Sequence, residues 1–131
     1  MVVDTSALLA IVFDEAEREK FEDLILRSPT AATSVVSVVE MTIAMASRQL
    51  DTDPLKLDGI LSTLRINVLA VDAAQGLLAR QAFVQYGRGR HPARLNFGDC
   101  FSYALAKARN DTLLFKGDDF ARTDVVPAWQ P

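Results

Sequence analysis

Four segments of this 131-residue chain carry acidic side chains where strands of a parallel sheet are expected to end. Asp4 follows a short β-branched run, Glu40 lies one turn into a helix predicted after the second strand, and Asp99 opens a later helix. Asp118 and Asp119 follow the last clear strand. In parallel α/β sheets, functional groups gather beyond the carboxyl ends of the strands. The four segments are therefore expected to share one site.

Each acid also has an ordinary structural interpretation. Asp4 and Asp99 can cap helices, an interaction worth about 1 kcal/mol. Asp118 and Asp119 are common turn residues. Glu40 is harder to explain in this way, because nearly all its neighbours in the sequence are apolar. A buried carboxylate without a partner is costly, so Glu40 requires a partner or water.

Carboxylates that share a pocket require a cation. Two of them about 4 Å apart repel by about 4 kcal/mol at an effective dielectric constant of about 20. No Lys or Arg adjoins Asp4, Glu40 or Asp99, although Lys116 is expected to be within reach of the pocket. An all-oxygen site favours a hard divalent ion, Mg²⁺ with Mn²⁺ as a possible substitute. The chemistry that fits is metal-assisted hydrolysis of a phosphodiester.

A stretch without any acid, residues 73–98, precedes Asp99. Its basic side chains are Arg80, Arg88, Arg90 and Arg94, together with His91. We predict that Arg88, Arg90 and Arg94 bind backbone phosphates of a substrate. Two alternatives remain: an ordinary solvated surface, or a non-catalytic RNA- or protein-binding module that uses residues 88–94. The formal net charge of −3 argues against a protein that simply coats nucleic acid.

Other α/β chemistries fit the sequence less well. A phosphatase that forms an aspartyl phosphate needs a second acid at position 6, which is Ser6. The segment Gly87-Arg88-Gly89 lacks the third glycine of a dinucleotide-binding loop, and no Walker-type phosphate loop is present. Catalysis by Ser, His and Asp would depend on His91 alone.

The composition limits where the protein is expected to act. A single Cys100 and a single His91 exclude a disulfide framework and a Cys/His zinc site. The longest apolar run, Ala7 to Phe13, is far shorter than the roughly 20 residues that span a bilayer. Asp4 stands where a secretory signal would need positive charge. We therefore expect a cytoplasmic protein that does not bind membranes.

Short apolar strands alternate with helices along the chain, which predicts parallel pairing through right-handed crossovers. The expected strands are 1–4, 30–35, 66–71 and 112–116, with a short edge strand at Val125-Val126. The expected helices follow Asp4 and cover 15–27, 36–50, 54–64, 73–86 and 99–109. We predict an α/β fold, a single three-layer α/β/α domain over residues 1–131.

Four motifs in sequence order carry a family resemblance. They are Val2–Leu8 (VVDTSAL), Val38–Glu40 (VVE), Leu95–Cys100 (LNFGDC) and Lys116–Phe120 (KGDDF). Together they resemble the PIN-domain ribonucleases, particularly the VapC-type toxins of toxin–antitoxin pairs. The resemblance runs over essentially the whole chain. It implies a four- to five-stranded parallel sheet and an acidic, Mg²⁺-dependent endoribonuclease site.

Carried over by position, the resemblance makes Asp4 and Asp99 the principal metal ligands and Glu40 the third acid. The fourth acid falls at Asp118 or Asp119. We favour Asp119, because the acid before the phenylalanine is the commoner one in this motif, and Asp118 is the second choice.

The resemblance also implies supporting residues and partners. Thr5 or Ser6 is expected to hydrogen-bond a ligand carboxylate or a metal-bound water, and Asn96 to orient Asp99 or to contact the substrate. The expected partners are an RNA substrate, a VapB-type antitoxin in a toxin–antitoxin hetero-oligomer, and a second copy in a homodimer. Some apolar side chains of the predicted helix 36–50 are available to cover such surfaces, although most are expected to pack in the core.

Overall fold

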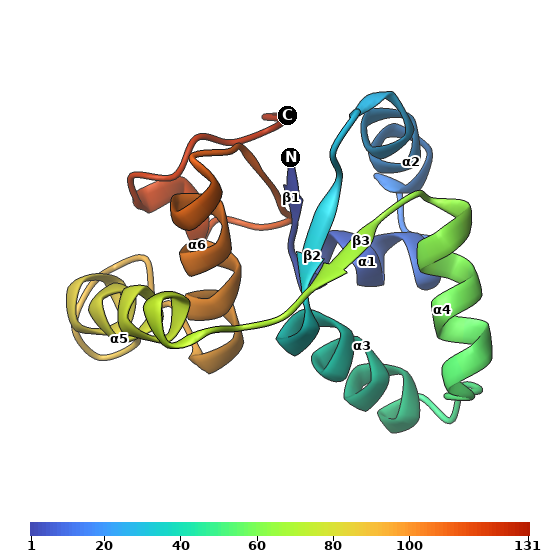
Figure 1. Ribbon diagram of the computed structural model, residues 1–131, viewed down its shortest axis with the longest axis horizontal. Coiled ribbons are helices and arrows are strands. Elements are labelled where there is room, and N and C mark those ends of the chain that lie inside the picture. Colours follow the sequence, from blue (N-terminus) through green and yellow to red (C-terminus); the bar gives the residue numbers. More distant parts are fainter.

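Four short parallel strands form the centre of the computed structural model, which describes all 131 residues. The sheet has the order β3-β2-β1-β4 (Figure 1). Its strands are β1 (Val2–Val3), β2 (Ala32–Ser34), β3 (Asn67–Leu69) and β4 (Leu113–Leu114). In register, Val2 lies between Ala32 and Leu113. The central strand β1 therefore points its carboxyl end, and Asp4 beyond it, to the middle of one sheet edge.

Helices cover both faces of this sheet (Figure 1). They are α1 (Thr5–Val12), α2 (Arg18–Arg27), α3 (Val35–Ser47), α4 (Pro54–Thr63), α5 (Ala73–Tyr86) and α6 (Phe97–Arg109), with a short 3₁₀ helix at Phe120–Arg122. Because successive strand residues face opposite sides, Val2 and Leu113 enter the core beneath α5 and α6. Val3 and Leu114 enter the second core, which α1 to α4 complete. The predicted three-layer α/β/α fold is confirmed.

Polar caps start the helices that follow the strands. The Asp4 carboxylate accepts from the Ser6 backbone N–H at the start of α1, and the Ser34 hydroxyl accepts from the Val36 N–H at the start of α3. Asp72 caps α5 in the same way. Each cap satisfies a backbone donor that the first helical turn leaves free. These turns place α1 and α3 directly at the strand ends, and the acids of the two segments with them.

Several boundaries differ from the sequence-based prediction. The strand expected over 30–35 ends at Ser34, because Ser34 caps α3 and Val35 is already helical. The last main helix begins at Phe97, two residues before Asp99, because Asn96 provides its cap. The edge strand expected at Val125-Val126 is reduced to one parallel bridge between Leu113 and Pro127. Proline has no N–H to donate and cannot extend such a ladder.

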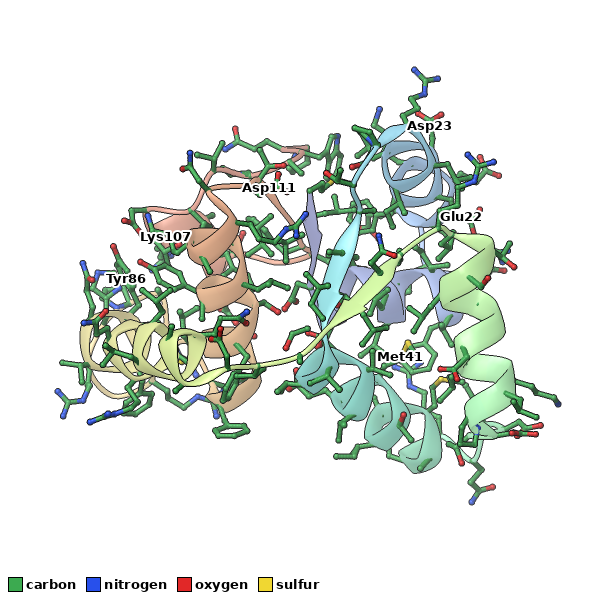
Figure 2. All side chains as sticks on the ribbon, viewed as in Figure 1. Glu22, Asp23, Met41, Tyr86, Lys107 and Asp111 are labelled. Carbon is green, nitrogen blue, oxygen red and sulfur yellow. The ribbon has the colours of Figure 1, made fainter.

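The side chains of α3 divide between the core and the surface. Met41 and Met45 are buried, and Figure 2 shows Met41 between α3 and α4. Ile43 points outward and is 65% exposed. The prediction that most apolar side chains of the helix 36–50 pack in the core holds for the two methionines but is wrong for Val39, Ile43 and Leu50, which are exposed. None of the helices has the length and apolar character that a membrane span would require.

Candidate active site

Asp4 lies at the centre of the site and is only 2% exposed. Its Oδ2 accepts hydrogen bonds from the Ser6 backbone N–H (2.9 Å) and the Ser6 hydroxyl (2.6 Å). Its Oδ1 accepts from the Ser102 hydroxyl at 2.5 Å. The Ser6 oxygen in turn accepts from the Lys116 backbone N–H at 3.0 Å. Ser6 thus connects the end of β1 to the segment that follows β4.

Glu40 projects from α3 toward the start of α1 and α6. Its Oε1 accepts from the Thr5 hydroxyl at 2.7 Å, and its carboxylate lies against the backbone of Gly98. A Cβ atom at position 98 would come within 1.9 Å of the Glu40 Oε2. Burial raises the pKa of Glu40, the charge of Asp4 raises it further, and the Thr5 hydrogen bond opposes both. Gly98 is therefore needed for this close approach, a role that sequence reasoning missed.

Asp99 belongs to a reciprocal capping arrangement at the start of α6. Its Oδ2 accepts from the Asn96 backbone N–H at 2.9 Å, and the Asn96 Oδ1 accepts from the Asp99 N–H at 2.9 Å. Burial is the main cause that raises the pKa of Asp99 to about 7, and the charges of Asp4, Asp119 and Glu40 add to it. Four acids from separate segments are thus electrostatic neighbours.

The two acids that follow β4 take different positions. Asp119 is one of the charges that raise the pKa of Asp99, whereas Asp118 is not. Asp118 instead lines a separate hollow of about 350 Å³ together with Glu17, Lys116 and Trp129. Of this pair, only Asp119 therefore interacts electrostatically with the other acids.

Lys116 does not supply a cation to this cluster, contrary to expectation. Its Nζ makes ion pairs with Glu15 (2.6 Å) and Glu17 (2.9 Å), two acids of the segment that leads into α2. No salt bridge involves Asp4, Glu40 or Asp99. The carboxylates therefore face one another without any side-chain counter-charge.

The acids do not form a closed metal-binding shell. Nowhere do three Asp, Glu, His or Cys side chains come close enough together to hold an ion. The side chains therefore do not adopt the expected cage around one ion, and like charges this near one another repel. The donor set still fits a hard divalent cation, because it consists of oxygen alone, lacks a competing Lys or Arg, and runs from the buried Asp4 through the half-buried Glu40 and Asp99 to the exposed Asp119. The side chains would have to draw together around such an ion.

The arginine-bearing loop lies immediately before Asn96. Two hydrogen bonds of 2.9 Å close the loop at its base. The Leu95 N–H donates to the Tyr86 carbonyl, and the Arg88 N–H donates to the Leu95 carbonyl. Arg88, Arg90 and Arg94 are exposed, and none of the three makes a salt bridge. The loop therefore presents positive charge next to the start of α6.

Two buried serines at the site were not singled out from the sequence. Ser102 lies three residues after Asp99 on α6, and Ser37 lies three residues before Glu40 on α3. Positions three apart share one face of a helix, so each serine lies on the face that carries the acid. The three-residue spacing from each acid is the sequence feature that could have identified these two serines.

Comparisons with known proteins bear on this arrangement. The chain matches the family model of the PIN domain over residues 1–126. It is 46% identical over 126 residues to a ribonuclease VapC of Mycolicibacterium smegmatis, covering 96% of this chain and 98% of the relative. It is 45% identical over 129 residues to ribonuclease VapC42 of Mycobacterium tuberculosis, covering 98% of each.

Solved structures show the same fold. VapC20 of Mycobacterium tuberculosis, described as a toxin that cleaves the sarcin–ricin loop, matches with a TM-score of 0.77 at 22% identity, over 99% of this chain and 98% of that one. A toxin–antitoxin complex from Klebsiella pneumoniae matches with a TM-score of 0.73 at 18% identity, over the same shares. With sequence relatives along nearly its whole length, the chain belongs to the PIN-domain family, among the VapC ribonucleases.

Proposed function

We propose that this protein is a Mg²⁺-dependent endoribonuclease that hydrolyses RNA phosphodiester bonds and acts as the toxin of a toxin–antitoxin pair. The observation that carries the proposal is the cluster of Asp4, Glu40, Asp99 and Asp119, whose charges act on one another without a neighbouring Lys or Arg. The VapC ribonuclease relatives support the same activity. The lone, buried Cys100 is consistent with work in the reducing cytoplasm.

Asp4 and Asp99 would hold the ion, Mg²⁺ or in its place Mn²⁺, and Glu40 and Asp119 complete the acidic pocket. When bound, the ion activates water, shields the scissile phosphate and stabilises the leaving oxygen. Asp119 is favoured over Asp118 because its charge acts on Asp99.

The neighbouring polar groups of this chain position the carboxylates. Thr5 orients Glu40, Ser6 orients Asp4, and the Asn96 backbone N–H orients Asp99. Each of these hydrogen bonds leaves at least one oxygen of its carboxylate available, because each carboxylate has two oxygens and about four acceptor sites. These hydrogen bonds limit how far each carboxylate can turn, so only a small movement of the side chains is needed when an ion binds.

Replacing Arg88, Arg90 and Arg94 together with alanine is expected to weaken RNA binding and to reduce its salt dependence. Each phosphate contact that is lost lowers the slope of log affinity against log salt by about 0.7 for a single strand. KM should rise while kcat changes little, because these side chains do not belong to the acidic cluster. Cleavage rates measured against RNA concentration at two salt concentrations check this.

The same triple variant separates the proposal from the alternative of a non-catalytic binding module. In such a module, the arginine variant would lose all function, whereas Asp99→Asn would be silent. Here Asp99→Asn should abolish cleavage and the arginine variant should keep its kcat, so a silent Asp99→Asn variant would refute the nuclease.

Gly98→Ala is expected to reduce cleavage strongly with little loss of stability. The new methyl group would overlap the Glu40 carboxylate, which is the flexible end of a long side chain and can swing away. Displacing this third acid should lower kcat by about tenfold or more, as changes to the support of a metal site commonly do. Gly76→Ala on α5 is the matched control, because its Cβ would meet nothing within 4 Å. Thermal unfolding and RNA cleavage of both variants test the prediction, which fails if Gly98→Ala cleaves normally.

We propose a VapB-type antitoxin and a second copy of the chain as protein partners. Similar folds are found in the Klebsiella pneumoniae toxin–antitoxin complex and in VapBC2 of Rickettsia felis bound to promoter DNA. An apolar stripe on α3 is available for pairing, since Val35, Val39 and Ile43 are 41%, 55% and 65% exposed at four-residue spacing.

Ile43→Glu is expected to convert a homodimer into a monomer, because it places a charge in the middle of this stripe. Light scattering on the purified chain measures the molecular mass. Val126→Glu is the control, because Val126 is similarly exposed (62%) but lies outside α3. An Ile43→Glu variant that remains a dimer would show that this stripe is not the interface.

A further inference from the structure

Two serines connect the acid-bearing helices α3 and α6 to Asp4. Ser37 on α3 and Ser102 on α6 are 0% and 1% exposed. The Ser102 hydroxyl lies 2.5 Å from the Asp4 Oδ1, and the Ser37 and Ser102 oxygens are 3.3 Å apart. Both hydroxyls are shielded from bulk solvent, so they bond to each other and to Asp4.

The direction of this chain of hydrogen bonds follows from counting protons. A serine hydroxyl has one proton to donate, and an ionised carboxylate can only accept. The Ser102 proton is directed at Asp4, so the Ser37 hydroxyl must donate to the Ser102 oxygen. Hydrogen bonds aligned in this way polarise and strengthen one another.

The same counting distinguishes the two oxygens of Asp4. Oδ2 receives two donors, the Ser6 backbone N–H and the Ser6 hydroxyl, whereas Oδ1 receives only the Ser102 hydroxyl. Each carboxylate oxygen has about two acceptor sites. Oδ2 is therefore saturated, and the one open site of Asp4 is on Oδ1.

Ser102 and Ser37 also join the two helices that present the other acids. Ser37 shares a helix face with Glu40, and Ser102 shares one with Asp99. A contact between the two serines therefore fixes how the acid-bearing faces of α3 and α6 meet at Asp4.

We propose that Ser102, supported by Ser37, is a positioning residue that directs the open site of the Asp4 Oδ1 toward a divalent cation. Without the Ser102 hydroxyl, Oδ1 would have two open sites and the carboxylate could rotate about its remaining bonds to Ser6. The inference rests on the proposed metal-dependent function.

Ser102→Ala is expected to weaken Mn²⁺ binding by about tenfold, within the range typical of residues that orient metal ligands. Isothermal titration calorimetry with Mn²⁺ alone, without RNA, provides the measurement. In cleavage assays at fixed metal concentration, kcat should fall while KM for RNA stays the same. Ser37→Ala should weaken Mn²⁺ binding by a smaller factor, because it leaves the Ser102–Asp4 bond in place. Ser102→Thr retains the hydroxyl and should bind Mn²⁺ with nearly the affinity of the wild-type chain.

Thr33→Val is the matched control. Thr33 is fully buried and its hydroxyl donates to the Val3 carbonyl at 2.7 Å, so it resembles Ser102 in burial and bonding but makes no hydrogen bond to the Asp4 carboxylate. It should lower the unfolding temperature without changing Mn²⁺ affinity. Unchanged affinity in both serine variants, or an equal loss in Thr33→Val, would overturn the inference. A wild-type chain that binds no divalent ion and cleaves RNA in EDTA would instead overturn the proposed function itself, and the inference with it.

Discussion

Asp99→Asn is expected to abolish RNA cleavage while preserving the fold. The amide has the same shape as the carboxylate, and its oxygen can still accept from the Asn96 N–H that starts α6. The substitution does, however, remove the negative charge that attracts a cation to position 99. A loss of at least about 10³-fold in cleavage rate is expected, which corresponds to about 4 kcal/mol of transition-state stabilisation.

The free energy of unfolding should depend on pH differently in the wild-type chain and in the Asp99→Asn variant. The folded-state pKa of Asp99 is raised from 3.8 to about 7, chiefly by burial. An acid whose pKa is raised on folding stabilises the folded state when protonated, and this contribution is lost as pH rises through about 7. The metal-free wild-type chain should therefore become less stable between pH 4 and pH 7, and Asp99→Asn should lack that part of the decline.

Cleavage assays and thermal unfolding at several pH values measure both effects. Asp118→Asn is the matched control, because Asp118 is an exposed neighbour of Asp119 that does not act on Asp99. It should cleave RNA nearly as well as wild type. Normal cleavage by Asp99→Asn would exclude the acidic cluster as the catalytic centre.

Removing divalent ions with EDTA is expected to stop cleavage completely, and adding Mg²⁺ or Mn²⁺ in excess should restore it. The metal affinity should rise with pH up to about 7, because Asp99 must release its proton before it can bind a cation. Below that pH, the loss should be about tenfold per pH unit for a single released proton. Calorimetric titrations with Mn²⁺ between pH 5.5 and pH 8 measure this dependence.

Ion binding should also stabilise the folded chain. At a free Mn²⁺ concentration about 100 times Kd, the free energy of unfolding should increase by about 2.7 kcal/mol. The Asp99→Asn variant should show little of this increase and provides the control. Undiminished cleavage in EDTA would contradict the metal-dependent mechanism.

Local patterns in the sequence were sufficient to predict the general architecture. Apolar runs marked the strands, and capping residues such as Asp72 marked where helices begin. The alternation of strands and helices implied parallel pairing, which in turn placed Asp4 and the segment before Asp119 at the same sheet edge. These steps depend on near neighbours in the chain and on general rules of sheet topology.

Contacts between distant segments could not be predicted in this way. Ser102 bonds a residue 98 positions away, and Lys116 pairs with Glu15 from 101 positions away. The sequence indicated only that Lys116 is within reach of the acidic pocket, and it did not predict the ion pairs with Glu15 and Glu17. The close approach of Glu40 to Gly98 likewise depends on how α3 and α6 pack.

Asp4 has two tasks, because the carboxylate proposed as a ligand also caps α1 through its bond to the Ser6 N–H. For producing a harmless version of the protein, for example to purify it in quantity or to capture uncut RNA, position 4 is therefore a poor choice. An amide there has only one accepting oxygen and cannot accept from both Ser6 and Ser102, so a buried hydroxyl would lose its partner together with the chemistry. The amide at position 99 keeps its local hydrogen bonds and is the better starting point for such work.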